Sequence, residues 1–316
     1  MTPHDPHDIK RRDFLRKSVA GAALIPLGSA NAEENDSKAG KLPKDFSTDP
    51  VALVSLTDQI RCPRIGLGTG VHGGMRQCNL TRMPRKDALE IFQIAYDLGI
   101  RLFDLADLYG THEICREALA GKPRDSYVLS SKLWPHFRSL PEKERPSADI
   151  VVKRFLKELN TDYLDLVQIH CAGVPDWRAL FEPYFDDLEK LKQQGLIRAH
   201  GISFHSLTAV REAVSIPWVD VMHVRFNGAN IRMDGTWEEN AEALQAARAK
   251  GKGIIAMKVL GEGAIRDPEE RRKSIDKVIR SQCVNAMVVG FEKKEHFTEF
   301  LNNASNTLKA MAAESV

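Results

Sequence analysis

The regular alternation of short apolar segments with helical patterns limits the possible folds of this chain more than any other feature. Eight segments have the length and apolar content of buried strands, and each is followed by a stretch with helical spacing. The strand segments span residues 64–68, 101–103, 127–131, 163–169, 197–201, 219–223, 253–257 and 286–289. Eight such pairs without a break predict a closed parallel (β/α)8 barrel, a TIM barrel, as a single domain over residues 51–312.

The segments between the strands are consistent with this fold. Helices are expected over residues 84–98, 112–120, 147–159, 177–194, 207–214, 237–250, 268–281 and 294–303. Before the first strand, residues 51–55 and 59–61 predict a short N-terminal β-hairpin that closes the lower end of the barrel. An open, doubly wound sheet is the alternative. Against it, the glycines of residues 66–70 lack the Gly-x-Gly-x-x-Gly spacing and open no helix directly.

Charge and cysteine content argue against several classes of function. The chain has 45 Lys and Arg residues and 43 Asp and Glu residues. Residues 1–32 contain five of the basic and three of the acidic residues, so the rest of the chain has 45 − 5 = 40 basic and 43 − 3 = 40 acidic residues. A domain without net charge has no overall field that would attract nucleic acid or an anionic membrane. The five cysteines are widely spaced and form no Cys-x-x-Cys pair, so neither a zinc site nor a disulfide framework is indicated.

The first 50 residues differ from the rest in composition. Residues 1–32 contain a basic start with Arg11 and Arg12, a small and apolar stretch over 18–30, and Ala30-Asn31-Ala32, which is the layout of a secretory signal. The paired arginines resemble the twin-arginine export signal of bacteria. We therefore expect a signal peptide over 1–32, a flexible linker over 33–50, binding of the precursor by the twin-arginine export machinery, and a periplasmic mature protein without a membrane anchor. The alternative is a basic tail on a cytosolic protein.

Titratable side chains follow three consecutive strand segments. Asp104 follows the second, Lys132 the third and His170 the fourth, and Tyr109 lies in the loop after Asp104. Enzymes with (β/α)8 barrels carry out their chemistry at this end of the strands. Each residue alone is more often a helix cap, a core residue or a solvated charge. Their occurrence together predicts an active site.

This set of side chains suits the delivery of a proton to a carbonyl oxygen. The ammonium group of Lys132 would lower the pKa of the Tyr109 phenol and make it a better general acid. Asp104 would pair with Lys132 and keep it charged, and His170 would orient the carbonyl group. Because no side chain supplies a hydride, a bound nicotinamide cofactor is required.

Four motifs, in this order, resemble the signatures of the aldo-keto reductase family. They are Phe103-Asp104-Leu105-Ala106-Asp107-Leu108-Tyr109-Gly110, Ser131-Lys132, residues 163–170 and Gly201-Ile202-Ser203. The resemblance covers about residues 51–303 and implies an eight-stranded barrel with the nicotinamide cofactor over its upper mouth. It also implies reduction of a small carbonyl substrate, or the reverse oxidation of an alcohol, with the catalytic roles on Asp104, Tyr109, Lys132 and His170.

The resemblance further implies a set of cofactor-binding positions. These are Gly68, Thr69, Ser203, His223, Met257, Lys258, Val259, Leu260, Gly261, Lys293 and Lys294. Three positions depart from the family pattern, since His223 stands where glutamine is frequent, Phe204 where asparagine is usual and Met257 where many members carry an aromatic residue. Parts of the sequence resemble a branch that often adds a cysteine cluster for iron and sulfur. That cluster is absent from this sequence, and no metal is expected.

NADP is the cofactor expected from the habit of the family, with NAD as the alternative. The group that contacts the 2′-phosphate of NADP is usually a basic residue just past the position of Gly290. In this chain Glu292 occupies that place, followed by Lys293 and Lys294. An acid there disfavours a phosphate and accepts a hydrogen bond from a ribose hydroxyl, whereas either lysine would restore the binding of NADP.

The substrate pocket is expected between four loops, residues 71–83, 134–146, 171–177 and 226–237. Candidates to line it are His72, Trp134, His136, Trp177 and Arg232. Two other functions remain as alternatives. The first is a catalytically silent barrel that senses nicotinamide cofactor as a binding or regulatory subunit, against which the joint presence of Lys132 and Tyr109 argues. The second is a metal-dependent isomerase or lyase with Asp104 and His170 as ligands, which the positive charge of Lys132 disfavours.

Overall fold

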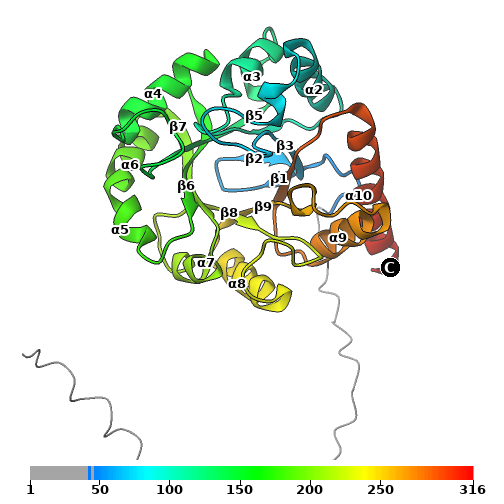
Figure 1. Cartoon of the computed structure of the whole chain (residues 1–316). Helices are drawn as coiled ribbons and strands as arrows, with labels where there is room; N and C mark the ends of the chain where they lie inside the picture. The colour runs from blue at the N-terminus through cyan, green and yellow to red at the C-terminus, as the bar shows by residue number, and fades with distance from the viewer. Residues whose placement is uncertain (1–41, 44–45, 316) are drawn as a thin grey trace, which may run out of the picture. The chain divides into compact units, whose positions relative to one another are not determined.

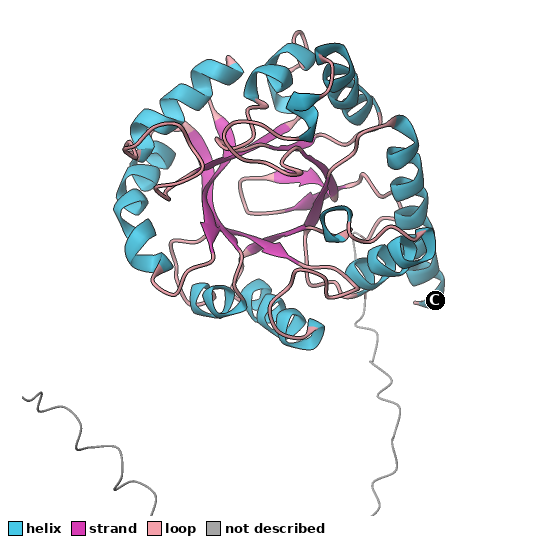
Figure 2. Ribbon diagram, in the orientation of Figure 1, coloured by secondary structure: helices cyan, strands magenta, loops and turns pink. Residues whose placement is uncertain are grey.

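The computed structural model describes residues 42–43 and 46–315, and in this part of the chain eight parallel strands close into a barrel. Each strand pairs with the next along the chain, and the last pairs with the first. Figures 1 and 2 show the ring of strands enclosed by helices. The strands are β3 (Ile65–Gly68), β4 (Leu102–Asp104), β5 (Val128–Leu133), β6 (Leu164–Ala172), β7 (Ile197–Phe204), β8 (Val221–Arg225), β9 (Gly253–Met257) and β10 (Ala286–Val289). The predicted (β/α)8 fold is confirmed.

The predicted helices lie in the expected order, with two differences in extent, and a short additional helix, α1 (Asn79–Arg82), lies in the loop after β3. The others are α2 (Arg85–Asp97), α3 (His112–Ala118), α4 (Ala148–Leu159), α5 (Trp177–Phe181), α6 (Phe185–Gln193), α7 (Leu207–Ala213), α8 (Trp237–Ala249), α9 (Pro268–Arg280) and α10 (Lys294–Glu314). The single helix predicted over 177–194 is divided by a 3-10 turn (Glu182–Tyr184), because Pro183 has no backbone N–H for a helical hydrogen bond. Helix α10 extends well past the predicted end, since Ala304, Leu308 and Met311 continue its buried stripe.

The predicted hairpin is present and closes the lower end of the barrel. Strands β1 (Leu53–Ser55) and β2 (Arg61–Pro63) pair antiparallel. Leu56 and Ile60, in the turn between them, are buried together with one side chain from most of the barrel strands, among them Leu102 and Val128. The turn lies so close to the barrel that a Cβ atom at Gly253 would come within 2.3 Å of the Leu56 carbonyl oxygen. This contact explains why glycine begins β9.

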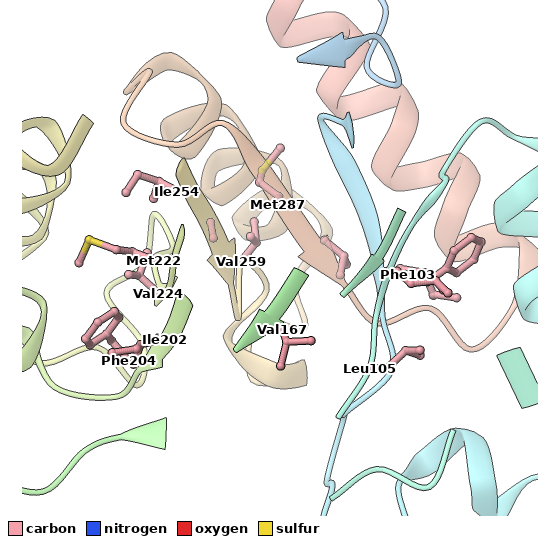
Figure 3. Packing of buried hydrophobic residues seen from close by; sticks show 14 of the residues in the cluster. Phe103, Leu105, Val167, Ile202, Phe204, Met222, Val224, Ile254, Val259 and Met287 are labelled. Carbon is pink, nitrogen blue, oxygen red and sulfur yellow. The ribbon is translucent and has the colours of Figure 1, made fainter. Parts of the chain in front are cut away.

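The hydrophobic core divides between the inside of the barrel and the layer under the helices. Side chains alternate along each strand, so Leu102 packs inside with the hairpin, whereas Phe103 packs outside against helix α2, where its ring centroid is 5.7 Å from that of Phe92. Figure 3 shows part of the outer layer, including Phe103, Val167 and Phe204. The strands are thereby covered on both faces, and the side chains at their carboxyl ends are held on a rigid frame.

Residues before the barrel were predicted as a signal peptide and a linker. The signal peptide, residues 1–32, lies outside the described residues, as does most of the linker. Phe46 packs against the core, and the guanidinium group of Arg64 donates to the carbonyl oxygen of Asp49 at 3.0 Å, so residues 46–50 are joined to the barrel. Among the described residues, no helix has the length and apolar character needed to cross a membrane.

Candidate active site

A buried ion pair forms the base of the site at the carboxyl ends of β4 and β5. The Lys132 ammonium nitrogen is 2.5 Å from Asp104 Oδ1 and donates to the carbonyl oxygen of Leu105 at 3.0 Å. Burial raises the pKa of Asp104 and lowers the pKa of Lys132, and the attraction between the two charges opposes both shifts. Both residues were predicted just past the ends of their strands, but β4 includes Asp104 and β5 includes Lys132.

Tyr109 lies above this pair, in the loop that follows β4. Its hydroxyl oxygen is 3.4 Å from His170 Nε2, and the Lys132 nitrogen is 5.2 Å from the centroid of its ring. Burial, followed by the charge of Asp104, raises the pKa of the Tyr109 phenol. The predicted net lowering of this pKa is therefore wrong, because burial and the negative charge of Asp104 raise it. A neutral phenol retains the proton that a general acid must donate.

His170 is directed into the site by an irregularity in β6. The register between β6 and β7 shifts between Ile169 and Ala172, where β6 holds one residue more than its partner. Cys171 accommodates the extra residue by adopting a left-handed backbone conformation with a φ of 73°. Its N–H donates to Ser203 Oγ at 2.8 Å. Burial, followed by the charge of Lys132, lowers the pKa of His170 well below its usual value. The imidazole is therefore neutral at physiological pH.

A second buried histidine lies on the other side of Asp104. His223 pairs across β7 and β8 with Ser203, and its Nδ1 is 3.7 Å from Asp104 Oδ1. Neither of its ring nitrogens has a hydrogen-bond partner among the described residues. Burial, followed by the charge of Lys132, lowers the pKa of His223. The structure thus places His223, completely buried, beside the ion pair.

A cavity of about 470 Å³ opens beside Asp104 and Tyr109. Five of the predicted cofactor positions line it: Gly68, Met257, Lys258, Val259 and Leu260. The other six, Thr69, Ser203, His223, Gly261, Lys293 and Lys294, do not line it. The Thr69 hydroxyl instead donates to the carbonyl oxygen of Asp104 at 2.8 Å, which fixes the end of β4. The structure therefore brings only part of the predicted set to this cavity.

One wall of the cavity is a backbone segment in an unusual conformation. Lys258, Gly261, Glu262 and Gly263 all have positive φ values, of 58°, 61°, 57° and 84°. Non-glycine residues adopt this region at some cost in free energy, and such strain clusters at binding sites. The ammonium group of Lys258 lies 2.9 Å from Glu262, which also pairs with the predicted pocket residue Arg232. Ion pairing thus links this wall to the loop after β8.

The far end of the cavity carries several charged side chains near α9 and the start of α10. Arg271 forms two hydrogen bonds with Glu299, at 2.7 and 3.0 Å. Glu292 lines the cavity and accepts from the Asn79 amide at 2.5 Å. The lining also includes Arg266 and Lys258 as cations and apolar side chains such as Phe300. These residues fit a nicotinamide dinucleotide, whose phosphates need cations and whose rings need apolar walls.

Of the predicted substrate-pocket residues, two lie next to the catalytic set. The ring centroid of Trp134 is 5.2 Å from that of His170 and 4.6 Å from that of His136. Trp177 was predicted at the pocket, but it is buried in the outer core, where its indole N–H donates to Glu212 at 2.7 Å. His72 is exposed and contacts Asn79.

A charged cluster around Tyr109 was missed in the sequence. Asp107, two residues before Tyr109, accepts from Arg76 Nε at 3.0 Å and from Arg154 at 2.8 Å. Arg76 also pairs with Glu142 at 2.7 Å, which joins the loops after β3, β4 and β5. The position of Asp107 in the 103–110 motif is the only signal that could have indicated it, since its partners are distant in the chain. Within the described part of the chain, no group of three or more His, Cys, Asp or Glu residues is arranged to hold a metal ion.

Comparison with known proteins gives a consistent result. Residues 64–315 match the model of the aldo/keto reductase family. Methylglyoxal reductase DkgB of Salmonella typhi is 28% identical over 208 residues, which cover 65% of this chain and 70% of that protein. D-threo-aldose 1-dehydrogenase of a Pseudomonas species is 27% identical over 254 residues, 72% of this chain and 73% of the other. A crystal structure of a putative aldo-keto reductase from Pseudomonas aeruginosa superimposes with a TM-score of 0.66 at 25% identity, covering 82% of this chain and 97% of that one.

Proposed function

The chain belongs to the aldo/keto reductase family and is an oxidoreductase, and from this premise we propose that it reduces an aldehyde or ketone with NADH or NADPH, or catalyses the reverse oxidation of an alcohol. One observation carries the proposal. The Tyr109 hydroxyl and His170 Nε2 lie 3.4 Å apart above the buried pair of Asp104 and Lys132, and the cavity opens at Tyr109. A carbonyl oxygen placed between phenol and imidazole would meet two groups able to hydrogen-bond it.

Each of the four side chains has a separate role in this proposal. Tyr109 donates its proton to the carbonyl oxygen, and His170, which is neutral, holds that oxygen by a hydrogen bond. When Tyr109 loses its proton, the ammonium group of Lys132, 5.2 Å from the ring centroid, stabilises the phenolate. Asp104 keeps Lys132 charged and in place. The reduced nicotinamide would supply the electron pair that none of these side chains carries.

The cofactor would be held by the residues along the cavity. Gly68, Met257, Val259 and Leu260 offer close backbone or apolar contact, and Lys258 offers a cation for a phosphate. Although the family resemblance predicted NADP, Glu292 lines the cavity and Lys293 and Lys294 do not. A carboxylate at this end repels a phosphate and accepts from a ribose hydroxyl, so its position favours NAD.

The test of this function is a titration followed by a turnover assay. Purified protein is mixed with NADH and with NADPH while fluorescence is followed, and carbonyl compounds are then screened for loss of the absorbance of the reduced cofactor. We expect dinucleotide binding and turnover of at least one carbonyl compound. Tight binding with no turnover of any aldehyde or ketone would instead favour the alternative of a cofactor-sensing barrel.

We also propose that the precursor is exported by the twin-arginine route and that the mature protein is periplasmic. Arg11 and Arg12, the apolar stretch after them and the small residues at 30–32 support this proposal. Replacement of both arginines by lysine should retain the protein in the cytoplasm, which cell fractionation and immunoblotting would detect. Unchanged export of the double variant would contradict the proposed route.

A further inference from the structure

Three of the six exposed large apolar side chains in the described part of the chain lie in loops at the carboxyl ends of barrel strands, the end that carries the proposed active site. Phe137 is 76% exposed, Met75 55% and Val174 38%. They belong to the loops after β5, β3 and β6, respectively. Phe137 is the most exposed large apolar side chain in the described part of the chain. An aromatic ring held in water next to a binding site is a candidate contact for a ligand.

These loops form one continuous rim. The N–H of Met75 donates to the carbonyl oxygen of Ser139 at 3.1 Å, so the loop after β3 contacts the loop after β5. His136 Nε2 lies 3.1 Å from the carbonyl oxygen of Cys171, which joins the loop after β5 to the end of β6. Trp134 and His136 lie between this rim and the catalytic residues, and the ring of Trp134 packs edge-on against the ring of His170. The route from the rim to His170 is therefore aromatic.

Two polar groups on this route already have hydrogen-bond partners within the protein. The indole N–H of Trp134 donates to the carbonyl oxygen of Arg138, and His136 Nε2 contacts Cys171. Two nearby cations have partners as well, since Arg145 donates to the carbonyl oxygen of His136 at 2.7 Å and Arg76 pairs with Asp107 and Glu142. A polyhydroxylated substrate would find few partners here, whereas an apolar group would remove apolar surface from water.

We propose that the substrate is an apolar carbonyl compound, in which an alkyl chain of several carbons or an aromatic ring is attached to the reacting carbonyl group. Its carbonyl oxygen lies at Tyr109 and His170, and its apolar part runs past Trp134 to Met75, Phe137 and Val174. This inference rests on the proposed function and narrows its substrate class.

The test compares straight-chain aldehydes from propanal to octanal, together with glyceraldehyde. We expect kcat/KM to rise about two- to fourfold per methylene group and propanal to be preferred over glyceraldehyde. F137S should lower kcat/KM for octanal about tenfold but change that for propanal less than about twofold, and F137L should restore most of the loss. Ile150, 59% exposed on helix α4, gives the matched control I150S, which should change neither value.

A second measurement separates this inference from the proposed function. Alkyl amides carry a carbonyl group that the enzyme would not reduce, and their binding is followed by tryptophan fluorescence. Their affinity should rise with chain length in the native protein and not in F137S, whether or not turnover occurs. Chain-length independence of both kcat/KM and amide affinity would overturn the inference, as would an equal effect of F137S on propanal and octanal. A loss of self-association in F137S with unchanged chain-length dependence would show that the rim instead joins two copies of the chain.

Discussion

At the scale of single residues, the site depends on the protonation states that burial imposes. Burial keeps the Tyr109 phenol and the His170 imidazole neutral, while the only buried charges beside them, Asp104 and Lys132, neutralise each other within the described site. The phenol thus holds a proton at physiological pH and gives it up only when a developing oxyanion accepts it. Lys132 matters most at that moment, because its charge stabilises a phenolate more than a phenol.

The role of Tyr109 can be tested by removing one oxygen atom. Tyr109→Phe should lower kcat/KM for carbonyl reduction about 10²- to 10⁴-fold, the usual contribution of a general acid, while the affinity for the dinucleotide stays within about twofold. Steady-state kinetics and fluorescence titration measure the two quantities. Tyr96→Phe is the matched control, since the Tyr96 hydroxyl contacts Ser126 at 2.8 Å, away from the mouth. Equal loss of turnover and of cofactor affinity in Tyr109→Phe would contradict the assigned role.

Glu292 should decide which dinucleotide is preferred. The native protein should bind NADH more tightly than NADPH, and Glu292→Lys should shift the ratio of the two dissociation constants toward NADPH by about tenfold or more. Glu295→Lys makes the same charge change on the first turn of α10 without a place on the cavity, and should leave the ratio nearly unchanged. Tighter binding of NADPH by the native protein, with no response to Glu292→Lys, would refute this expectation.

At the scale of elements, the loop that carries Tyr109 is fixed by its neighbours. A Cβ atom at Gly70 would lie 2.2 Å from Tyr109 Cζ, so the loop after β3 covers the tyrosine ring closely. Gly110 has a φ of 69°, and a Cβ there would lie 2.0 Å from the Arg76 carbonyl oxygen. The same Arg76 pairs with Asp107. Asp107 is therefore a positioning residue, which acts on catalysis through the loop of Tyr109.

Asp107→Asn keeps the size of this side chain and removes its charge. We expect kcat to fall about tenfold, because a displacement of about 1 Å in a catalytic group has effects of this order or larger, while KM for the dinucleotide changes little. The free energy of unfolding should fall by roughly 1–3 kcal/mol, because both arginines lose their buried negative partner. The loss is not larger because Arg76 and Arg154 are themselves partly exposed to solvent. Kinetics and urea denaturation measure these changes.

The control for this variant is an ion pair that is exposed at both ends. Arg85 and Glu117 join α2 and α3 at 2.7 Å, and Arg85→Ala should change stability by less than about 1 kcal/mol and leave kcat unchanged. If Asp107→Asn lowered stability but left kcat as in the native protein, Asp107 would be a purely structural residue.

At the scale of the whole molecule, a closed barrel with a hairpin across its lower end leaves one open mouth for chemistry. Leu56 and Ile60 fill the lower end, and the catalytic residues stand at the other ends of the same strands. The barrel therefore buries several titratable groups at once, and their protonation is linked to folding. His170, His205 and His223 are the clearest examples, since the pKa of each is lowered first by burial, that of His205 to about 3.

These histidines make stability depend on pH with a definite sign. Because their pKa values are lower in the folded state, the unfolded chain binds more protons below about pH 6.5, and the folded protein loses stability as pH falls through that value. Each such group contributes up to about 1.4 kcal/mol per pH unit. His223→Gln should therefore reduce the loss of unfolding free energy between pH 7 and pH 5, measured by urea denaturation, by roughly 1–2 kcal/mol. Replacement of the exposed His72 by Gln should leave this loss of unfolding free energy unchanged. If His223→Gln also left the pH dependence of the unfolding free energy unchanged, His223 would not be buried in its neutral form.

The sequence by itself determined the order of strands and helices, the hairpin and the strand ends that carry Asp104, Lys132 and His170. These features are local, because hydrophobic periodicity and turn residues act over a few positions, and a run of strand–helix pairs has few ways to bury its apolar faces. Tyr109 was found in the same way, from its spacing after Asp104.

Only the tertiary structure decided how these side chains interact. The bulge at Cys171 directs His170, and burial with the charge of Asp104 raises the pKa of Tyr109, against expectation. Asp107 pairs with Arg76 and Arg154, which are distant from it in the sequence. Trp177 has the same aromatic character as Trp134 in the sequence, yet one lies in the core and the other beside His170. Burial, dielectric environment and contacts between distant segments set these outcomes, and none of them is a property of a short stretch of sequence.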